Sequence, residues 1–76
     1  MKDILETIIR NLVSNQEAIS VKEIEGERSI IFEVRVAESD MGKVIGKEGR
    51  VAKAIRSIIK AVAAKEGKRV TVEFIG

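Results

Sequence analysis

The chain has 76 residues, is 45% hydrophobic and carries a net charge of +2, which fits one small domain, residues 1–76, with its own core. It contains no cysteine and no histidine, and this excludes disulfides, thiol chemistry and most transition-metal sites. We therefore expect no metal and no other cofactor. The lack of cysteine also fits a cytoplasmic protein.

The first segment predicts an amphipathic helix that ends near residues 14–15. Asp3 and Glu6 have the spacing of a capping box, with Asp in place of the usual Ser or Thr. Charged residues interrupt the apolar positions, so we expect neither a signal peptide nor a membrane span, and no membrane partner. The apolar residues form a stripe two residues wide, at Ile4, Leu5, Ile8, Ile9, Leu12 and Val13.

Three strands are expected after this helix. Residues 30–36 alternate between apolar and other positions, which is typical of a half-buried strand. The same alternation at Ile19 and Val21 indicates an earlier strand, although Ile24 interrupts it, and the sequence EGER between the two predicts a hairpin turn. Residues 70–75 alternate again and predict the third strand.

Two helical patterns lie between the second and third strands. The first begins near Asp40, which we expect to cap it, and ends at Gly46. The second runs from about Gly49 to Lys65, with Gly67 at its C-cap. This longer helix has an apolar face, Val51, Ile55, Ile58, Ile59 and Val62, and an opposite basic face, Arg50, Lys53, Arg56 and Lys60.

The element order is therefore α-β-β-α-α-β, which predicts an α+β two-layer sandwich. A crossover through helices makes the second and third strands parallel, whereas the hairpin makes the first two antiparallel. We expect a three-stranded mixed sheet, covered on one face by three helices and open on the other.

Charge is distributed unevenly along the chain. Residues 41–69 hold nine Lys or Arg residues against Glu48 and Glu66, whereas the remainder holds five basic and ten acidic residues. A basic segment on an acidic body indicates a surface that binds an anion. A basic helix face that is merely solvated would give the same numbers, so charge alone leaves both interpretations open.

Three glycines, Gly42, Gly46 and Gly49, lie within this basic segment, although glycine inside a helix costs about 1 kcal/mol relative to alanine. A turn at residues 46–49 explains one or two of them, because glycine leaves the helical region with least strain. The helix that begins there offers free N–H groups and a positive dipole end, which suit a phosphodiester beside Lys47 and Arg50. A plain corner between two helices is the alternative.

The sequence VIGKEGRVAKAIRSI, residues 44–58, resembles the signature of the K-homology (KH) domain, and the resemblance covers essentially the whole chain. In that family a GxxG loop joins two helices and clamps the backbone of about four nucleotides. The loop here is residues 46–49. The helix and strand that precede the core resemble the type II arrangement, and the small size resembles the stand-alone bacterial proteins of the KhpA family.

This resemblance implies a cytoplasmic protein that binds single-stranded RNA and acts as an RNA chaperone or post-transcriptional regulator. It also implies pairing with a larger KH protein of the KhpB/Jag type. A clamp on so few nucleotides should bind weakly alone, which favours two linked sites, as in a homodimer or a complex with another RNA-binding protein. The RNA-binding residues expected from the motif are Gly42, Lys43, Ile45, Gly46, Lys47, Glu48, Gly49, Arg50 and Lys53.

Within this set, Gly42 would allow close approach of the RNA, and Ile45 would form an apolar floor unless it belongs to the core. Val72 is a weaker candidate of the same kind. Glu48 would repel a phosphate and weaken the clamp. Arg56 and Lys60 are expected to face solvent, and Phe32 and Phe74 are expected to pack in the core.

Three other functional classes compete with RNA binding. An enzyme is not expected, because Ser39 and Ser57 have no evident base and the chain lacks histidine and cysteine. A protein-interaction adaptor with a vestigial groove remains open. A duplex-DNA reader of the helix-turn-helix type fits the βααβ frame less well.

Overall fold

The structure is a computed structural model that describes residues 1–75. Its six main elements follow the predicted order, and short 3₁₀ turns occupy residues 16–18, 38–40 and 47–49. The elements are α1 (Lys2–Leu12), β1 (Ser20–Glu25), β2 (Ser29–Arg35), α2 (Met41–Ile45), α3 (Arg50–Lys65) and β3 (Arg69–Ile75).

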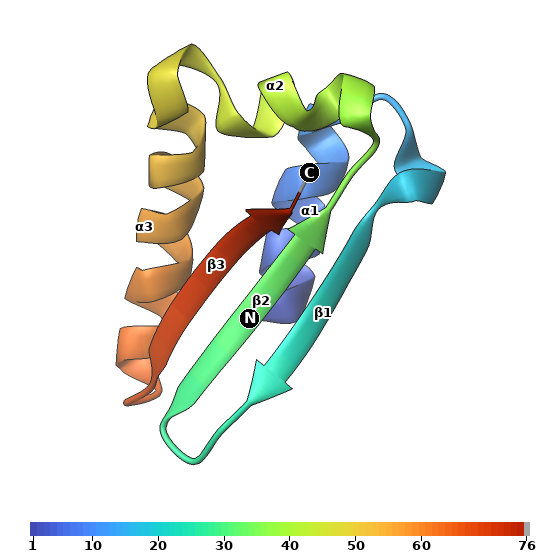
Figure 1. Ribbon diagram of the computed structural model, residues 1–76. Coiled ribbons are helices and arrows are strands. Elements are labelled where there is room, and N and C mark those ends of the chain that lie inside the picture. Colours follow the sequence, from blue (N-terminus) through green and yellow to red (C-terminus); the bar gives the residue numbers. More distant parts are fainter. Residues whose placement is uncertain (76) are drawn as a thin grey trace.

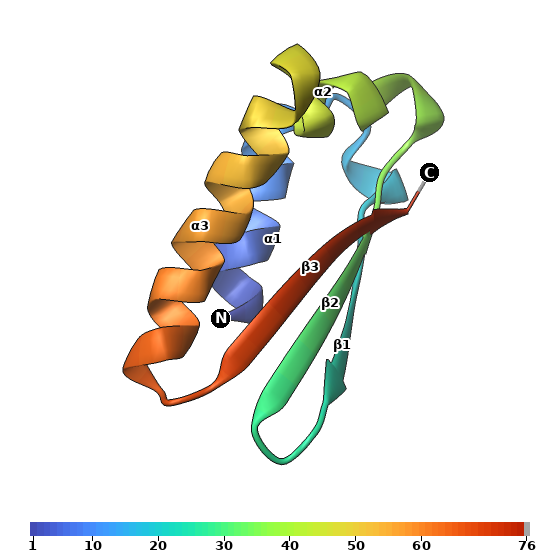
Figure 2. The same ribbon diagram turned by 60° about the vertical axis from the view of Figure 1, so that its left-hand side comes forward.

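The sheet has the order β1-β2-β3, with β2 in the centre (Figure 1). β1 pairs with β2 antiparallel and β3 pairs with β2 in parallel, as predicted. The three helices lie on one side of the sheet, and the other side is uncovered (Figure 2). Ile24, which interrupts the alternation of β1, pairs with Ile31 on that uncovered side.

The core lies between the helices and the inner face of the sheet. Phe32 is fully buried at its centre, as predicted, and Val72 is buried as well, so Val72 packs in the core and does not line the surface. Phe74 is only partly buried. The core cluster comprises Leu5, Ile9, Val13, Ile30, Phe32, Val34, Val44, Ile55, Ile59, Ala63, Val70 and Val72.

The buried side of α3 differs from the predicted one. Ile58 is 47% exposed, whereas Ala52 and Ala63 are buried together with Ile55 and Ile59. The apolar residues of α3 cover a wider part of its circumference than the part that is buried. The buried part includes the small side chains of Ala52 and Ala63. The prediction for Ile58 was therefore wrong.

The helix ends follow the predictions only in part. The capping box at Asp3 and Glu6 is not formed, because α1 already begins at Lys2 and has no side-chain cap. α1 also ends at Leu12, slightly earlier than predicted. Gly67 ends α3 as predicted: its φ is +70°, its N–H donates to the Ala64 carbonyl at 3.1 Å, and the Lys68 N–H donates to Ala63 at 3.0 Å. None of the helices described within residues 1–75 is both long and apolar enough to cross a membrane.

Candidate nucleic-acid interface

Residues 46–49 form a left-handed turn between α2 and α3. All four residues have positive φ angles: +49° at Gly46, +34° at Lys47, +62° at Glu48 and +86° at Gly49. The Gly46 carbonyl accepts the N–H groups of Gly49 at 2.8 Å and of Arg50 at 3.1 Å, which closes the turn. Because glycine adopts such angles without steric strain, the turn accounts for two of the three glycines.

Gly46 is required for a second reason. A Cβ atom at this position would lie 2.4 Å from Cγ2 of Val51, which is on the first turn of α3. The turn therefore brings α2 and α3 too close together for any side chain at residue 46. This close approach holds the loop against the start of α3.

The tip of the loop is a solvent-facing hollow with mixed charge. Lys47, Glu48 and Arg50 line it. Among residues 1–75, no carboxylate lies within ion-pair distance of Lys47, Arg50 or Lys53, so their charges are free to bind an anion. Glu48 lies in the same hollow and lowers the attraction for a phosphate.

The side of α2 next to the loop is open and partly apolar. Gly42 is exposed, and a Cβ atom placed there would meet no atom within 4 Å. Ile45 is 42% exposed, so its side chain is not part of the core. The two residues give this helix a surface that another molecule can approach closely, with an apolar contact beside the charged loop.

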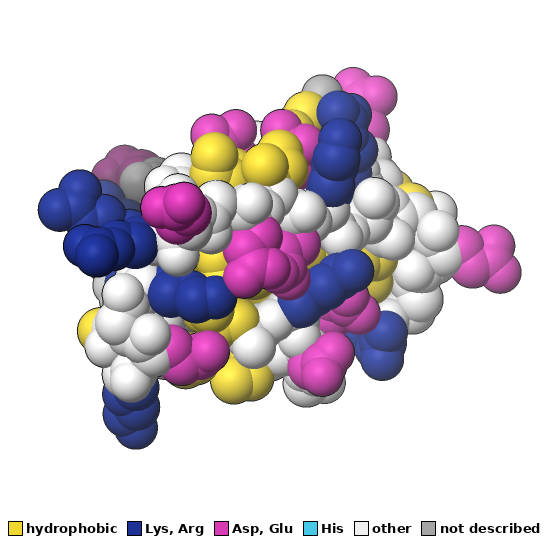
Figure 3. Space-filling view, turned by 90° about the horizontal axis from the view of Figure 1, so that it is seen from below, with side chains coloured by type: hydrophobic (Ala, Val, Ile, Leu, Met, Phe, Trp, Pro, Cys, Tyr) yellow, Lys and Arg dark blue, Asp and Glu magenta, His cyan; other side chains and the backbone are white. Residues whose placement is uncertain are grey.

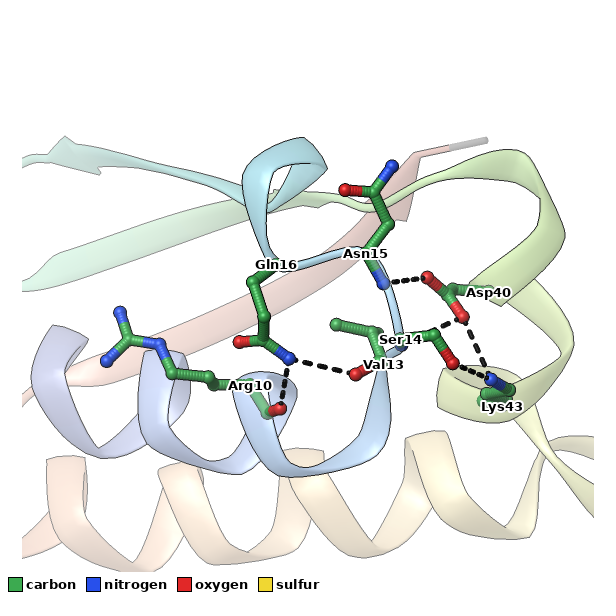
Figure 4. A network of polar contacts seen from close by, with 7 residues as sticks. All are labelled: Arg10, Val13, Ser14, Asn15, Gln16, Asp40 and Lys43. Carbon is green, nitrogen blue, oxygen red and sulfur yellow. Dashed lines mark hydrogen bonds and ion pairs between the residues drawn. The ribbon is translucent and has the colours of Figure 1, made fainter.

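Hydrogen bonds to Asp40 connect the start of α2 to the turn that follows α1 (Figure 4). Asp40 is the one buried charged residue of the described part of the chain. Its Oδ1 accepts the Ser14 N–H at 3.1 Å and its Oδ2 accepts the Asn15 N–H at 3.0 Å. Asp40 occupies the N-cap position of α2 as predicted, but its side chain makes no capping bond to that helix.

Lys43 adds two further contacts between α2 and this turn. Its Nζ lies 3.1 Å from Oδ1 of Asp40 and donates to the Ser14 hydroxyl at 2.6 Å (Figure 4). The backbone N–H groups of Asn15 and Ser14, and then Lys43, lower the pKa of the Asp40 carboxyl against the opposing effect of burial. Lys43 is thus held by the protein itself and offers less charge to a ligand than Lys47 does.

α3 and β3 contact each other through the side chain of Arg56. Arg56 donates its Nε–H to the Val72 carbonyl at 3.1 Å, and its guanidinium carbon lies 5.4 Å from the centre of the Phe74 ring. The expectation that Arg56 faces only solvent was therefore wrong. The basic face of α3 therefore borders β3 at Arg56.

The sequence matches a known family over nearly its whole length. Residues 2–74 match the family described as KhpA/KhpB, KH domain. The chain belongs to this family. The match covers the GxxG loop and all three strands, with the last residue of β3 outside it.

Several relatives of this KhpA/KhpB-family chain carry the name RNA-binding protein KhpA. The protein from Clostridium acetobutylicum is 60% identical over 75 residues, which cover 99% of this chain and all of the relative. Those from Caldanaerobacter subterraneus and Aquifex aeolicus are 56% and 47% identical over the same length, covering 100% and 95% of the relatives.

In this KH domain the nine expected RNA-binding residues lie on one stretch, from α2 through the loop to the first turn of α3. Sequence reasoning did not foresee that Arg56 contacts β3 or that Asp40 binds the turn after α1. The helical spacing of Arg56 with Arg50 and Lys53 placed it on the basic face, but nothing local indicated that β3 borders this face. Asp40 had no such signal, because its partners lie 25 and 26 residues away.

Proposed function

We propose that this KhpA/KhpB-family protein binds single-stranded RNA by clamping the sugar-phosphate backbone at the loop of residues 46–49. The observation that carries the proposal is the left-handed turn with Lys47 and Arg50 at its tip, two cations that form no ion pair within residues 1–75. The name RNA-binding protein KhpA, which its relatives carry, supports the same function.

In this proposal the loop and α2 have different roles. At the loop, Lys47 and Arg50 neutralise phosphates, and the missing side chain at Gly42 lets the RNA approach α2. Ile45 offers apolar contact to a base next to the clamped phosphate. Since neither tryptophan nor tyrosine occurs in the chain, bases would be held by van der Waals contact and hydrogen bonds more than by aromatic stacking.

A clamp of this size binds weakly. Neutralising about two to four phosphates gives a slope of log K against log salt of about −1.4 to −2.8 for a single strand. Useful affinity then comes from linking two sites, in a homodimer or in a heterodimer with a KhpB/Jag-type protein. In the cytoplasm such a complex would act as an RNA chaperone or post-transcriptional regulator. A strict monomer in sedimentation at high concentration would contradict the homodimer.

The direct test replaces Lys47, the only cation within the loop, by an acidic residue without straining the backbone. Lys47→Asp/Glu48→Asp suits the positive φ angles, because Asp and Asn tolerate the left-handed region better than other non-glycine residues. We expect this variant to stay folded by circular dichroism and to lose salt-dependent binding to a pool of short single-stranded RNAs. Lys47→Asn/Glu48→Asn is the matched control, and it should bind with intermediate affinity.

The single change Glu48→Asn isolates the acidic residue and should tighten binding by removing a repulsive carboxylate. Equal binding by the wild type and the Asp variant would mean that the loop is not the clamp. If the folded wild type binds no RNA at all, an adaptor role with a protein partner takes precedence.

A further inference from the structure

Beyond the loop, the surface where α3 borders β3, called the α3–β3 groove below, leads toward a hollow at the other end of the molecule. β3 runs beside α3 along most of the helix (Figures 1 and 2). Arg56 sits midway, bound to the Val72 carbonyl through one N–H while the other donors of its guanidinium remain available. The basic face of α3 therefore follows the free edge of the sheet away from residues 46–49.

A second basic hollow lies at the far end of this groove. It has a volume of about 320 Å³ and is lined by Lys60 of α3, by Lys68 and Arg69, and by Val70 and Thr71 of β3. Seen from this end of the molecule, Lys and Arg side chains gather on the side of α3 (Figure 3).

Two cations of this distal hollow, Lys60 and Arg69, form no ion pair within the described residues 1–75. Lys68 is paired with Glu25 across a distance of 2.9 Å, and Glu66 and Glu23 add to the negative field around it. By contrast, within residues 1–75 no carboxylate lies within ion-pair distance of Lys60 or Arg69. The hollow thus keeps two uncompensated positive charges that can bind phosphate groups.

The spacing separates this hollow from the loop. Lys60 follows Arg50 by ten positions in α3, which corresponds to about 15 Å along the helix axis. A strand bound at residues 46–49 must therefore run on for about this distance along α3 before it meets Lys60.

We propose that single-stranded RNA longer than about four nucleotides continues along the α3–β3 groove, and that Lys60 and Arg69 bind phosphate groups of its distal part. The inference rests on the proposed function, because it extends the path of the RNA held at the loop. Arg56, between the two hollows, would contact the intervening part of the strand.

The test compares oligouridines of about four and about ten nucleotides over a range of salt concentrations. Lys60→Gln/Arg69→Gln removes the two distal charges, and Arg10→Gln/Lys22→Gln removes two exposed charges on α1 and β1 as the matched control. For the wild type we expect the long RNA to give a slope steeper by about 1.4 than the short one, from about two more phosphates. This equals an extra fall in affinity of about sevenfold between 50 and 200 mM salt.

In Lys60→Gln/Arg69→Gln the slope for the long RNA should fall to that of the short RNA, whose own binding should stay unchanged. The control should keep the wild-type slope. Because each variant is compared on the same RNA, the greater number of binding registers on a long strand cancels.

The outcomes separate the inference from the function on which it rests. Equal slopes for the wild type and Lys60→Gln/Arg69→Gln on the long RNA would overturn the distal site and leave the clamp intact. The same holds if the control loses as much slope as the distal variant, because net charge would then explain the effect. A folded wild type that binds neither RNA would overturn the proposed function itself.

Discussion

Replacing Gly42 by alanine should stabilise the fold and weaken RNA binding. Gly42 lies in α2 with no positive φ, and an added Cβ would meet nothing within 4 Å. Alanine is favoured over glycine inside a helix by about 0.5–1 kcal/mol. We expect about 0.5 kcal/mol, because the position is near the start of a short helix, and hence a Tm raised by about 2–4 °C for a domain of this size.

The added methyl group would nevertheless stand on the surface that the RNA approaches. Thermal unfolding followed by circular dichroism measures the first effect, and titration with a short single-stranded RNA measures the second. Gly46→Ala is the matched control: its backbone conformation, with φ +49° and ψ 140°, costs a non-glycine residue about 1–3 kcal/mol, and its Cβ would also collide with Val51. That variant should therefore lower the Tm.

Two results would refute this reasoning in different places. If Gly42→Ala raises the Tm and binds RNA as well as the wild type, the RNA does not pass close to α2. If it lowers the Tm, the space around Gly42 is not open as described. Opposite changes in stability and binding would show that this glycine serves contact and not backbone conformation.

Two further predictions concern the support of the site and the core. The pKa of Asp40 is lowered from its ordinary value of 3.8, so its contribution to stability is present above that value and is lost as the pH falls through the lower pKa of the folded state. Asp40→Asn should be less stable than the wild type at pH 7, and urea midpoints should converge in acid; a gap independent of pH would contradict the role of the charge. Ile59→Ala should cost about 2–5 kcal/mol, whereas Ile58→Ala should cost less than about 1 kcal/mol, and equal costs would contradict the observed face of α3.

The sequence predicted those features of the fold that depend on neighbouring residues. Alternation with a period of two located β2 and β3, helical spacing located α1 and α3, and the glycines at 46, 49 and 67 marked the turns. The order of the elements then left one mixed sheet with its helices on one side. The residues of the loop could be proposed as a site for the same reason, because they are contiguous.

Features that depend on distant contacts could not be predicted in this way. Asp40 follows the local pattern of a helix cap, yet its carboxylate binds a turn that is remote in sequence. The helical wheel of α3 predicts which residues share its apolar side but not which of them pack against the sheet. For this reason the predictions that Ile58 is buried and that Arg56 faces only solvent were wrong. Both errors concern the orientation of one element against another, which the spacing along a single helix does not contain.

The position of α2, the loop and α3 within a single connection has a thermodynamic consequence. Residues 36–68 join β2 to β3, and these two strands are parallel, so β3 reaches its place only through the elements that carry the loop. The binding surface and the pairing of β2 with β3 are therefore expected to form and melt as one cooperative unit. A ligand held at residues 46–49 would then slow amide hydrogen exchange in the paired strands β2 and β3 as well as in the helices that it touches.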